Sequence, residues 1–126
     1  MTTLSTTAFT AIDFESAGTA PGKTDAPVQI GTCSWSSADG VTDTWISYIH
    51  TDQDITWSAQ KVHGITDKDL QNAPPLISPR PQIRTRLENR PIVAHGAGTE
   101  RKFLRAFPMH GFRPWVDTLT LSRRLI

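Results

Sequence analysis

The sequence predicts an α/β fold with a mixed sheet, in which an antiparallel meander of three strands is followed by parallel strands and helices. Two observations support this. The first 50 residues contain three β-rich segments separated by turn-forming residues. After residue 50, amphipathic helical segments alternate with short apolar runs. Strands that alternate with helices are typical of parallel pairing, so we expect both halves to join in one sheet.

In the first half, we expect strands over residues 7–14, 28–35 and 43–50. The segment 16–27 is rich in Gly and Pro and therefore predicts a loop. Between the second and third strands, Asp39-Gly40 is the strongest local signal of a hairpin turn. These features predict the antiparallel meander.

In the second half, Thr66 followed by two nearby aspartates is typical of a short capped helix. Residues 82–90 form an amphipathic segment and predict a helix, with Ile83 and Leu87 on one face. The apolar run 91–95 predicts a buried strand, parallel to the strands that it joins because a helical crossover precedes it. We expect three more elements: a helix over 100–107 with Phe103, Leu104 and Phe107 inward, a brief strand at 115–116, and a last helix over 118–126 capped by Asp117 or Thr118.

The overall composition is that of a globular chain whose 126 residues form one domain with a hydrophobic core. Hydrophobic residues make up 37% of the chain and charged residues 20%. No apolar run approaches the roughly 18 residues of a membrane span, and the N-terminus lacks the basic and apolar regions of a signal peptide. We therefore expect a cytoplasmic protein that does not act in a membrane. The single cysteine, Cys33, excludes an internal disulfide and disfavours a cysteine metal site.

Two carboxylates stand one residue apart near the end of the first strand. Residues i and i+2 of a strand share one face, so Asp13 and Glu15 lie side by side and repel each other unless a cation lies between them. Hard oxygen ligands at the carboxyl end of a strand suit Mg²⁺ or Mn²⁺. The alternative is a pair of solvated acids at a fraying strand end.

A third carboxylate, Glu100, begins the helix that follows strand 91–95. If that strand is parallel to the first, Glu100 arrives at the same sheet edge as Asp13 and Glu15. A cluster of three carboxylates is what two-metal phosphoryl chemistry requires. The alternative is an acid that complements the dipole of the first helical turn.

The charges divide unevenly between the two halves of the chain. Residues 1–63 hold two basic and seven acidic residues, whereas residues 64–126 hold eleven basic and five acidic ones. A basic region beside acidic metal ligands favours an anionic partner such as a single nucleic-acid strand. Arg101 and Lys102, next to Glu100, are the best candidates for phosphate contacts, and Trp57 is the tryptophan that we expect to be exposed. Ordinary solvated helix faces are the alternative.

Four segments of the sequence carry motifs in a recognisable order. FTAIDFESAGT (9–19) contains D-x-E, and VHGITDKDLQNAPPL (62–76) contains H-G-I-T. IVAHGAGTERKFL (92–104) and WVDTLTLSRRL (115–125) follow. In this order the segments resemble the motifs of the DnaQ-like 3′–5′ exonucleases of the DEDDh group, whose second motif is usually V-A-H-N-x-x-F-D-x-x-F-L and is followed by a D-T-L-x-L-A-R-R helix.

The resemblance implies an RNase H-like fold and a site with two Mg²⁺ or Mn²⁺ ions that hydrolyses terminal phosphodiesters. It implies that Asp13, Glu15 and Glu100 are the catalytic metal ligands. The backbone near Gly18 and Thr19 would approach the 3′-terminal nucleotide. His63 and Ile65 would line the pocket that holds this nucleotide. A turn histidine that makes a structural hydrogen bond is the alternative for His63. With Phe14 and Arg101, the expected substrate-binding set is Phe14, Gly18, Thr19, His63, Ile65 and Arg101.

The chain departs from the family pattern in two places. Gly96 stands where Asn is usual, and Glu100 replaces the usual Asp with a longer carboxylate. The family completes its site with H-x-x-x-x-D on a later helix, which supplies the general base and the fourth carboxylate, and neither is present here. We therefore expect an exonuclease-like domain that is C-terminally truncated and inactive, or nearly so, by itself.

Two further functions remain open on the sequence alone. One is a catalytically dead nucleic-acid-binding module of the same fold. The other is a protein-interaction domain that docks on a polymerase or a larger nuclease assembly. The intact Asp13 and Glu15 pair favours the exonuclease, because neither binding nor docking requires clustered acids that repel phosphate. The pattern does not distinguish DNA from RNA, and it leaves the oligomeric state open.

Overall fold

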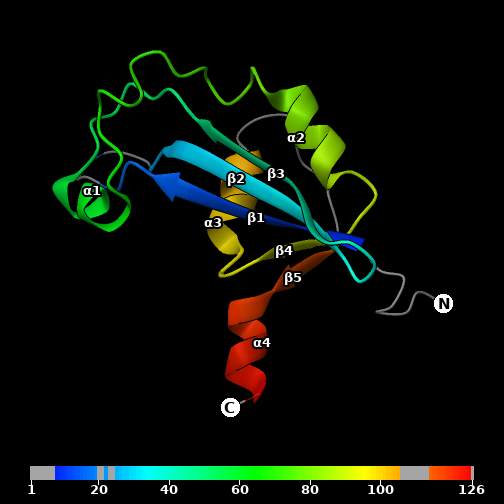
Figure 1. The fold of residues 1–126 in the computed structure, drawn as a ribbon. Helices are drawn as coiled ribbons and strands as arrows, with labels where there is room; N and C mark the ends of the chain where they lie inside the picture. Colours follow the sequence, from blue (N-terminus) through cyan, green and yellow to red (C-terminus); the bar gives the residue numbers. More distant parts are fainter. Residues whose placement is uncertain (1–7, 20–21, 23–24, 106–113, 126) are drawn as a thin grey trace.

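A computed structural model describes residues 8–19, 22, 25–105 and 114–125. It contains a five-stranded sheet in the order β3-β2-β1-β4-β5, with helices in the connections that follow β3 (Figure 1). The strands are β1 (Ala8–Ser16), β2 (Pro27–Ser36), β3 (Gly40–Tyr48), β4 (Ile92–Ala94) and β5 (Trp115–Asp117). The helices are α1 (Trp57–His63), α2 (Arg80–Leu87), α3 (Gly98–Arg105) and α4 (Thr118–Leu125). The predicted α/β mixed sheet is confirmed.

The three-stranded meander is longer than predicted. β1 pairs antiparallel with β2 along its whole length, and the irregularity in register comes only between Glu15 and Ser16. Asp13 is paired with Gly31, and Glu15 with Gln29. The two acids therefore lie inside a paired strand and not at a fraying end, because β2 supports β1 beyond the predicted boundary at residue 14.

The predicted parallel crossover is present. β4 pairs in parallel with β1, with Thr10 opposite Ile92 and Ala11 opposite Val93. β4 ends at Ala94, while β1 continues to Ser16. The last part of β1 therefore has no strand on that side, and α3 begins only four residues after β4 ends. This places the start of α3 beside the acidic end of β1.

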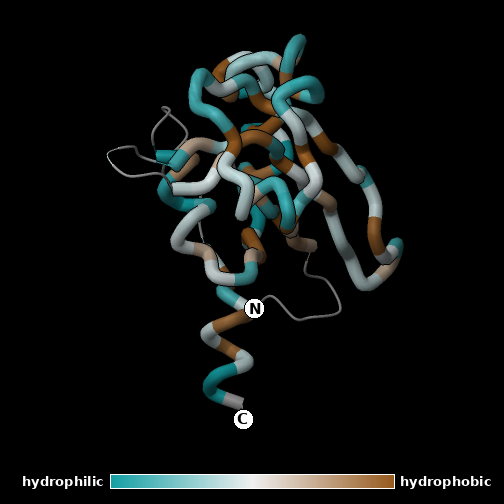
Figure 2. The backbone as a smooth tube through the Cα atoms, turned by 90° about the vertical axis from the view of Figure 1, so that its left-hand side faces the viewer, coloured by the Kyte–Doolittle hydropathy of each residue, from teal (hydrophilic) through white to brown (hydrophobic). Residues whose placement is uncertain are grey.

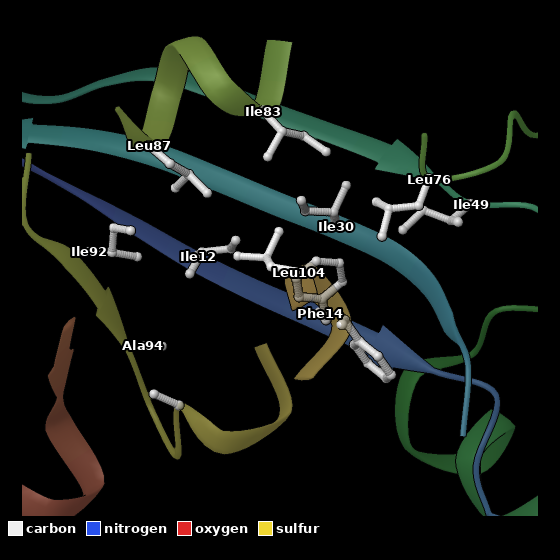
Figure 3. Packing of buried hydrophobic residues seen from close by; sticks show 12 residues of the cluster. Ile12, Phe14, Ile30, Ile49, Leu76, Ile83, Leu87, Ile92, Ala94 and Leu104 are labelled. Atoms are coloured by element: carbon white, nitrogen blue, oxygen red, sulfur yellow. The ribbon is translucent and has the colours of Figure 1, made fainter. Parts of the chain in front are cut away.

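Both α2 and α3 pack on the same face of the sheet. Ile83 and Leu87 of α2 join Phe103 and Leu104 of α3 in one buried cluster with residues of β1, β2 and β4 (Figure 3). Figure 2 shows hydrophobic segments in the interior of the body, whereas α4 projects away from the sheet. No helix in the described ranges is long and apolar enough to span a bilayer.

One predicted helix is absent, and one helix in the structure was not predicted. Residues 67–72 form turns and not a helix, although Thr66 and Asp69 do form the predicted reciprocal cap, with Asp69 Oδ2 accepting from the Thr66 N–H at 2.9 Å. Pro74 and Pro75 follow too closely for a helix to continue. Conversely, α1 was not predicted. The Thr56 hydroxyl caps it at one end, and Gly64, with a φ of 73°, ends it.

The remaining element boundaries shift by a few residues. α2 ends at Leu87 and not at residue 90, since Asn89 adopts a φ of 62°. α3 begins at Gly98, two residues before its predicted start. Phe107, predicted to point inward, and His110 lie outside the described residues.

Candidate functional site

Asp13 and Glu15 lie on the face of β1 opposite the hydrophobic core. Ile12 and Phe14 point into that core and are buried, and the side chains alternate along the strand. Asp13 is exposed and Glu15 is half-buried. The two acids therefore share one face of the strand, as predicted.

Glu100 stands in the first turn of α3 and is buried, with only 4% of its surface exposed. One carboxyl oxygen, Oε2, is enclosed without a hydrogen-bond partner in the described part of the chain. Burial raises the pKa of Glu100 above its usual value of 4.5, and the charges of Asp13 and Asp117 raise it further. Hydrogen bonds from the backbone N–H groups of Glu100 and Phe14 act in the opposite direction.

The structure thus brings Glu100 to the backbone of Phe14, between the two acids of β1. Glu100 is within electrostatic range of Asp13. Within the described ranges, however, no three His, Cys, Asp or Glu side chains lie close enough to form a ready metal cage. An enclosed oxygen without a partner, within electrostatic range of an exposed carboxylate, is a hard donor that fits Mg²⁺ or Mn²⁺ by its chemistry.

Asp117 serves as the predicted cap of the last helix. Its Oδ1 accepts from the N–H groups of Leu119 at 2.9 Å and Gly96 at 2.9 Å, and its Oδ2 accepts from Ala97 at 3.0 Å. These bonds join β5 and α4 to the turn before α3. Hydrogen bonds from the Ala97 and Gly96 N–H groups lead the causes that lower the pKa of Asp117 to about 2.

The Asp117→Asn variant should resist acid better, relative to its own stability at neutral pH, than the wild type. A lowered pKa in the folded state means that Asp117 stabilises the fold above pH 3.8 and that this contribution is lost as the pH falls toward 2. Urea unfolding at several pH values between 2 and 6 measures this. The exposed Asp67→Asn is the control, and equal acid sensitivity of Asp117→Asn and wild type would contradict the assignment.

His63 holds the loop that follows β1. Its Nε2 donates to the Ser16 carbonyl at 2.9 Å, and its Nδ1 accepts from the Ile65 N–H at 3.0 Å. A carbonyl only accepts and an amide N–H only donates, so the ring is the neutral tautomer with its proton on Nε2. The structural hydrogen bond considered for His63 is therefore present.

The other expected substrate-binding residues have different surroundings. Phe14 is buried and meets Phe103 edge-on at 5.3 Å between ring centroids, and Ile65 is buried in a second cluster with Ala17 and Val28. Thr19 is exposed. The side chain of Arg101 lies over the ring of Trp115.

Gly18 is fixed by residues that the sequence did not single out. The Gly18 N–H donates to Asp25 Oδ1 at 3.0 Å, and the Thr56 N–H donates to the Ala17 carbonyl at 2.7 Å. A Cβ at Gly18 would collide with the Thr56 hydroxyl. Asp25 before a strand is a common turn residue, so only the three-dimensional contact reveals its role.

His95 has a structural role. Its Nδ1 lies 2.9 Å from the Thr118 hydroxyl, and it thereby joins the end of β4 to the start of α4. This contact accounts for one ring nitrogen of His95.

Comparison with known proteins shows one consistent family. The family model RNase_T, an exonuclease model, matches residues 10–125. Two curated relatives are the DNA polymerase III PolC-type proteins of Thermotoga petrophila, 29% identical over 123 residues, and Thermotoga maritima, 28% identical. Each match covers 94% of this chain but only 9% of the relative.

Solved structures share the fold. Exonuclease X in complex with 5′-overhanging duplex DNA has a TM-score of 0.72 and 24% identity, covering 93% of this chain and 63% of that one. The zinc-bound form of the E. coli ExoI–ssDNA complex has a TM-score of 0.76 and 17% identity, covering 94% and 29%. Cell-death related nuclease 4 has a TM-score of 0.76 and 11% identity, covering 96% and 48%. Because the exonuclease model matches nearly the whole chain and the fold agrees, the chain belongs to the DnaQ-like exonuclease family and has its RNase H-like fold.

Proposed function

We propose that this chain is a metal-dependent 3′–5′ exonuclease domain that hydrolyses terminal phosphodiesters of DNA or RNA. The observation that carries the proposal is the buried Glu100 carboxyl, whose Oε2 has no partner among the described residues and lies within electrostatic range of Asp13. An ionisable oxygen is costly to enclose without a partner, and a divalent cation would compensate for that cost. Glu100 is thereby the proposed link between the two acids of β1 and the metal.

Mg²⁺ or Mn²⁺, two ions in the complete site, would be held by Asp13, Glu15 and Glu100. Bound there, the ions supply charge neutralisation for the attacking and leaving oxygens of an in-line displacement. The chain itself orients the ligands: β2 holds the two acids of β1 in a paired strand, and the Phe14 N–H faces the Glu100 carboxyl.

The loop after β1 is the proposed contact with the terminal nucleotide. The bond from His63 to Ser16 and the bond from Thr56 to Ala17 fix the path of the chain up to Gly18. The backbone at Gly18 and the exposed Thr19 can then approach the end of a strand. Phe14, His63 and Ile65 act on the substrate through this scaffold, because Phe14 and Ile65 are themselves buried.

The 126 residues contain no H-x-x-x-x-D sequence, so the general base and the fourth carboxylate of the family are not among them. A general base contributes about 10²–10⁴-fold to such a reaction. We propose that this polypeptide alone is inactive or nearly so. Polymerases or larger nuclease assemblies are the proposed partners, in line with the PolC-type relatives.

A gel assay tests the function. A 5′-labelled single strand of DNA or RNA is incubated with Mg²⁺, Mn²⁺ or EDTA, using this chain, the chain joined to a segment that supplies H-x-x-x-x-D, and the Asp13→Ala variant of each. We expect a metal-dependent ladder from the joined chain, about 10²–10⁴-fold faster than from this chain alone, and none from Asp13→Ala. A joined chain without any ladder would overturn the proposal.

The second candidate is a catalytically dead nucleic-acid-binding module. It is favoured by one observation, that no three candidate ligands form a ready metal cage in the described ranges. Strand binding that is the same in EDTA and Mg²⁺, without hydrolysis by the joined chain, would support this candidate. Absence of any strand binding would instead favour an interaction domain.

A further inference from the structure

A cavity lies at the β5 edge of the sheet and is lined by residues of α3, β5 and α4. It has a volume of about 390 Å³ and is lined by Arg101, Trp115, Val116, Asp117, Thr120 and Leu121. Cavities that bind small ligands or ligand groups begin at about 300 Å³. The candidate metal ligands Asp13, Glu15 and Glu100 do not line it, so it is a separate feature.

Arg101 is the cation of this cavity, and it has no carboxylate partner in the part of the chain that the structure describes. Its guanidinium carbon lies 5.2 Å from the centre of the Trp115 ring. A cation–π contact of this kind holds a guanidinium near the ring, and its N–H groups can still bind an anion. Trp115 itself packs against the core, so the platform is anchored.

The one acid in the lining is held by backbone N–H groups. Asp117 accepts hydrogen bonds from the backbone N–H groups of Gly96, Ala97 and Leu119, which occupy both of its oxygens. No ion pair joins Asp117 to Arg101 among the described residues. The cavity therefore contains a guanidinium that lies over an indole ring, a threonine, Thr120, and the apolar side chain of Leu121, of which 46% is exposed.

The positive charge continues along α3. Arg105 follows Arg101 by one helical turn, and its Nε donates to the Arg101 carbonyl at 3.4 Å. Cations that follow a helix suit a chain of phosphates better than one small molecule. Another cavity, lined by Trp57, Gln60 and Lys61 on α1, has a volume of about 210 Å³ and follows the acidic stretch of Asp52 and Asp54, which disfavours a polyanion.

We propose that the Arg101–Trp115 cavity binds a phosphodiester group of the nucleic-acid strand, with Arg101 as the phosphate ligand and Trp115 as its platform. The proposal rests on the proposed function, because the ligand it assigns to the cavity is the nucleic-acid strand of that function. The sugar or base next to the bound phosphate lies against Leu121. A free nucleoside monophosphate has the same phosphate chemistry and is the alternative source.

The test measures binding in EDTA, so that no hydrolysis is needed. The affinity of a 5′-fluorescein-labelled oligothymidylate is measured by anisotropy over a series of salt concentrations, for wild type, Arg101→Gln, Arg101→Lys and Arg84→Gln. Arg84 is the matched control: it is an exposed arginine on α2 that pairs with Glu88. We expect Arg101→Gln to weaken binding about tenfold and to reduce the salt dependence by roughly 0.7 in log–log slope. Arg101→Lys should lie in between, and Arg84→Gln should change affinity less than about twofold.

Equal effects of Arg101→Gln and Arg84→Gln, or no effect of either, would overturn the proposal. Thymidine monophosphate that displaces the strand from wild type at a concentration near its own binding constant, but not from Arg101→Gln, would assign the cavity to a free nucleotide and overturn the strand assignment. The outcome is separable from the exonuclease activity. If the joined chain hydrolyses the strand but Arg101→Gln binds it as tightly as wild type, only the cavity proposal is refuted. If Arg101→Gln weakens binding but the joined chain does not hydrolyse the strand, only the proposed activity is refuted.

Discussion

Replacing Glu100 with glutamine should make the metal-free protein more stable at neutral pH. The glutamine keeps the shape of the side chain and removes a charge that is buried, has one oxygen without a partner in the described structure, and faces Asp13 and Asp117. We expect a gain of about 1–2 kcal/mol in the free energy of unfolding, the size typical for relieving a buried unsatisfied polar group. Urea unfolding in EDTA at pH 7 measures it.

The sign of the pH dependence follows from the raised pKa. The folded state favours the protonated Glu100, so this group stabilises the fold below pH 4.5 and the contribution is lost as the pH rises through the raised value. The gain from Glu100→Gln should therefore appear only above pH 4.5. The exposed Glu88→Gln serves as the control. A glutamine variant that is less stable than wild type at pH 7 would show that the carboxylate is satisfied and would remove the main argument for a metal.

Alanine at Gly18 should destabilise the protein by about 2–4 kcal/mol, through both left-handed backbone strain and a lost cap. Gly18 has a φ of 91°, and a Cβ there would collide with the Thr56 hydroxyl. That hydroxyl accepts from the Ala59 N–H at 3.1 Å and so caps α1. Either the loop after β1 or the start of α1 must move, and the loop carries the proposed contact with the terminal nucleotide.

The matched control for Gly18 is Gly64→Ala. Gly64 has a similar φ of 73°, but a Cβ there would meet nothing within 4 Å, so only the backbone strain of about 1–2 kcal/mol applies. Urea unfolding compares the two variants, and hydrogen exchange at the Ala59 amide reports the cap. If both alanines cost the same and the Ala59 amide stays protected, the contact between Gly18 and Thr56 does not position the loop.

Much of the fold follows from local sequence patterns, because each predicted strand has its own alternation or apolar run. The parallel pairing of β4 with β1 follows from the crossover between them. α1 escaped prediction because it has seven residues and none of them is buried, so it shows no amphipathic period. Its caps at Thr56 and Gly64 specify it, and such caps are weak signals without a hydrophobic face.

The position of two candidate residues on β1 could be predicted from the sequence, but the surroundings of the candidate site could not. The period of two along a strand was enough to place Asp13 and Glu15 on one face. The burial of Glu100 depends on where β4 ends. β4 stops at Ala94 while β1 continues to Ser16, so the backbone of Phe14 has no strand on that side and is reached by α3. Likewise, the stacking of Arg101 on Trp115 joins residues of two elements whose spacing no local pattern reveals.

The measurement that tests the central claim most directly is a calorimetric titration of Mn²⁺ into this chain at pH 7, beside the Asp13→Asn, Glu100→Gln and Asp67→Asn variants. If Asp13, Glu15 and Glu100 form the metal site, the wild type binds Mn²⁺, the first two variants bind at least about tenfold more weakly, and the exposed control Asp67→Asn binds like wild type. Mn²⁺ binding that is unchanged by Asp13→Asn and Glu100→Gln, or absent from the wild type, would contradict the account.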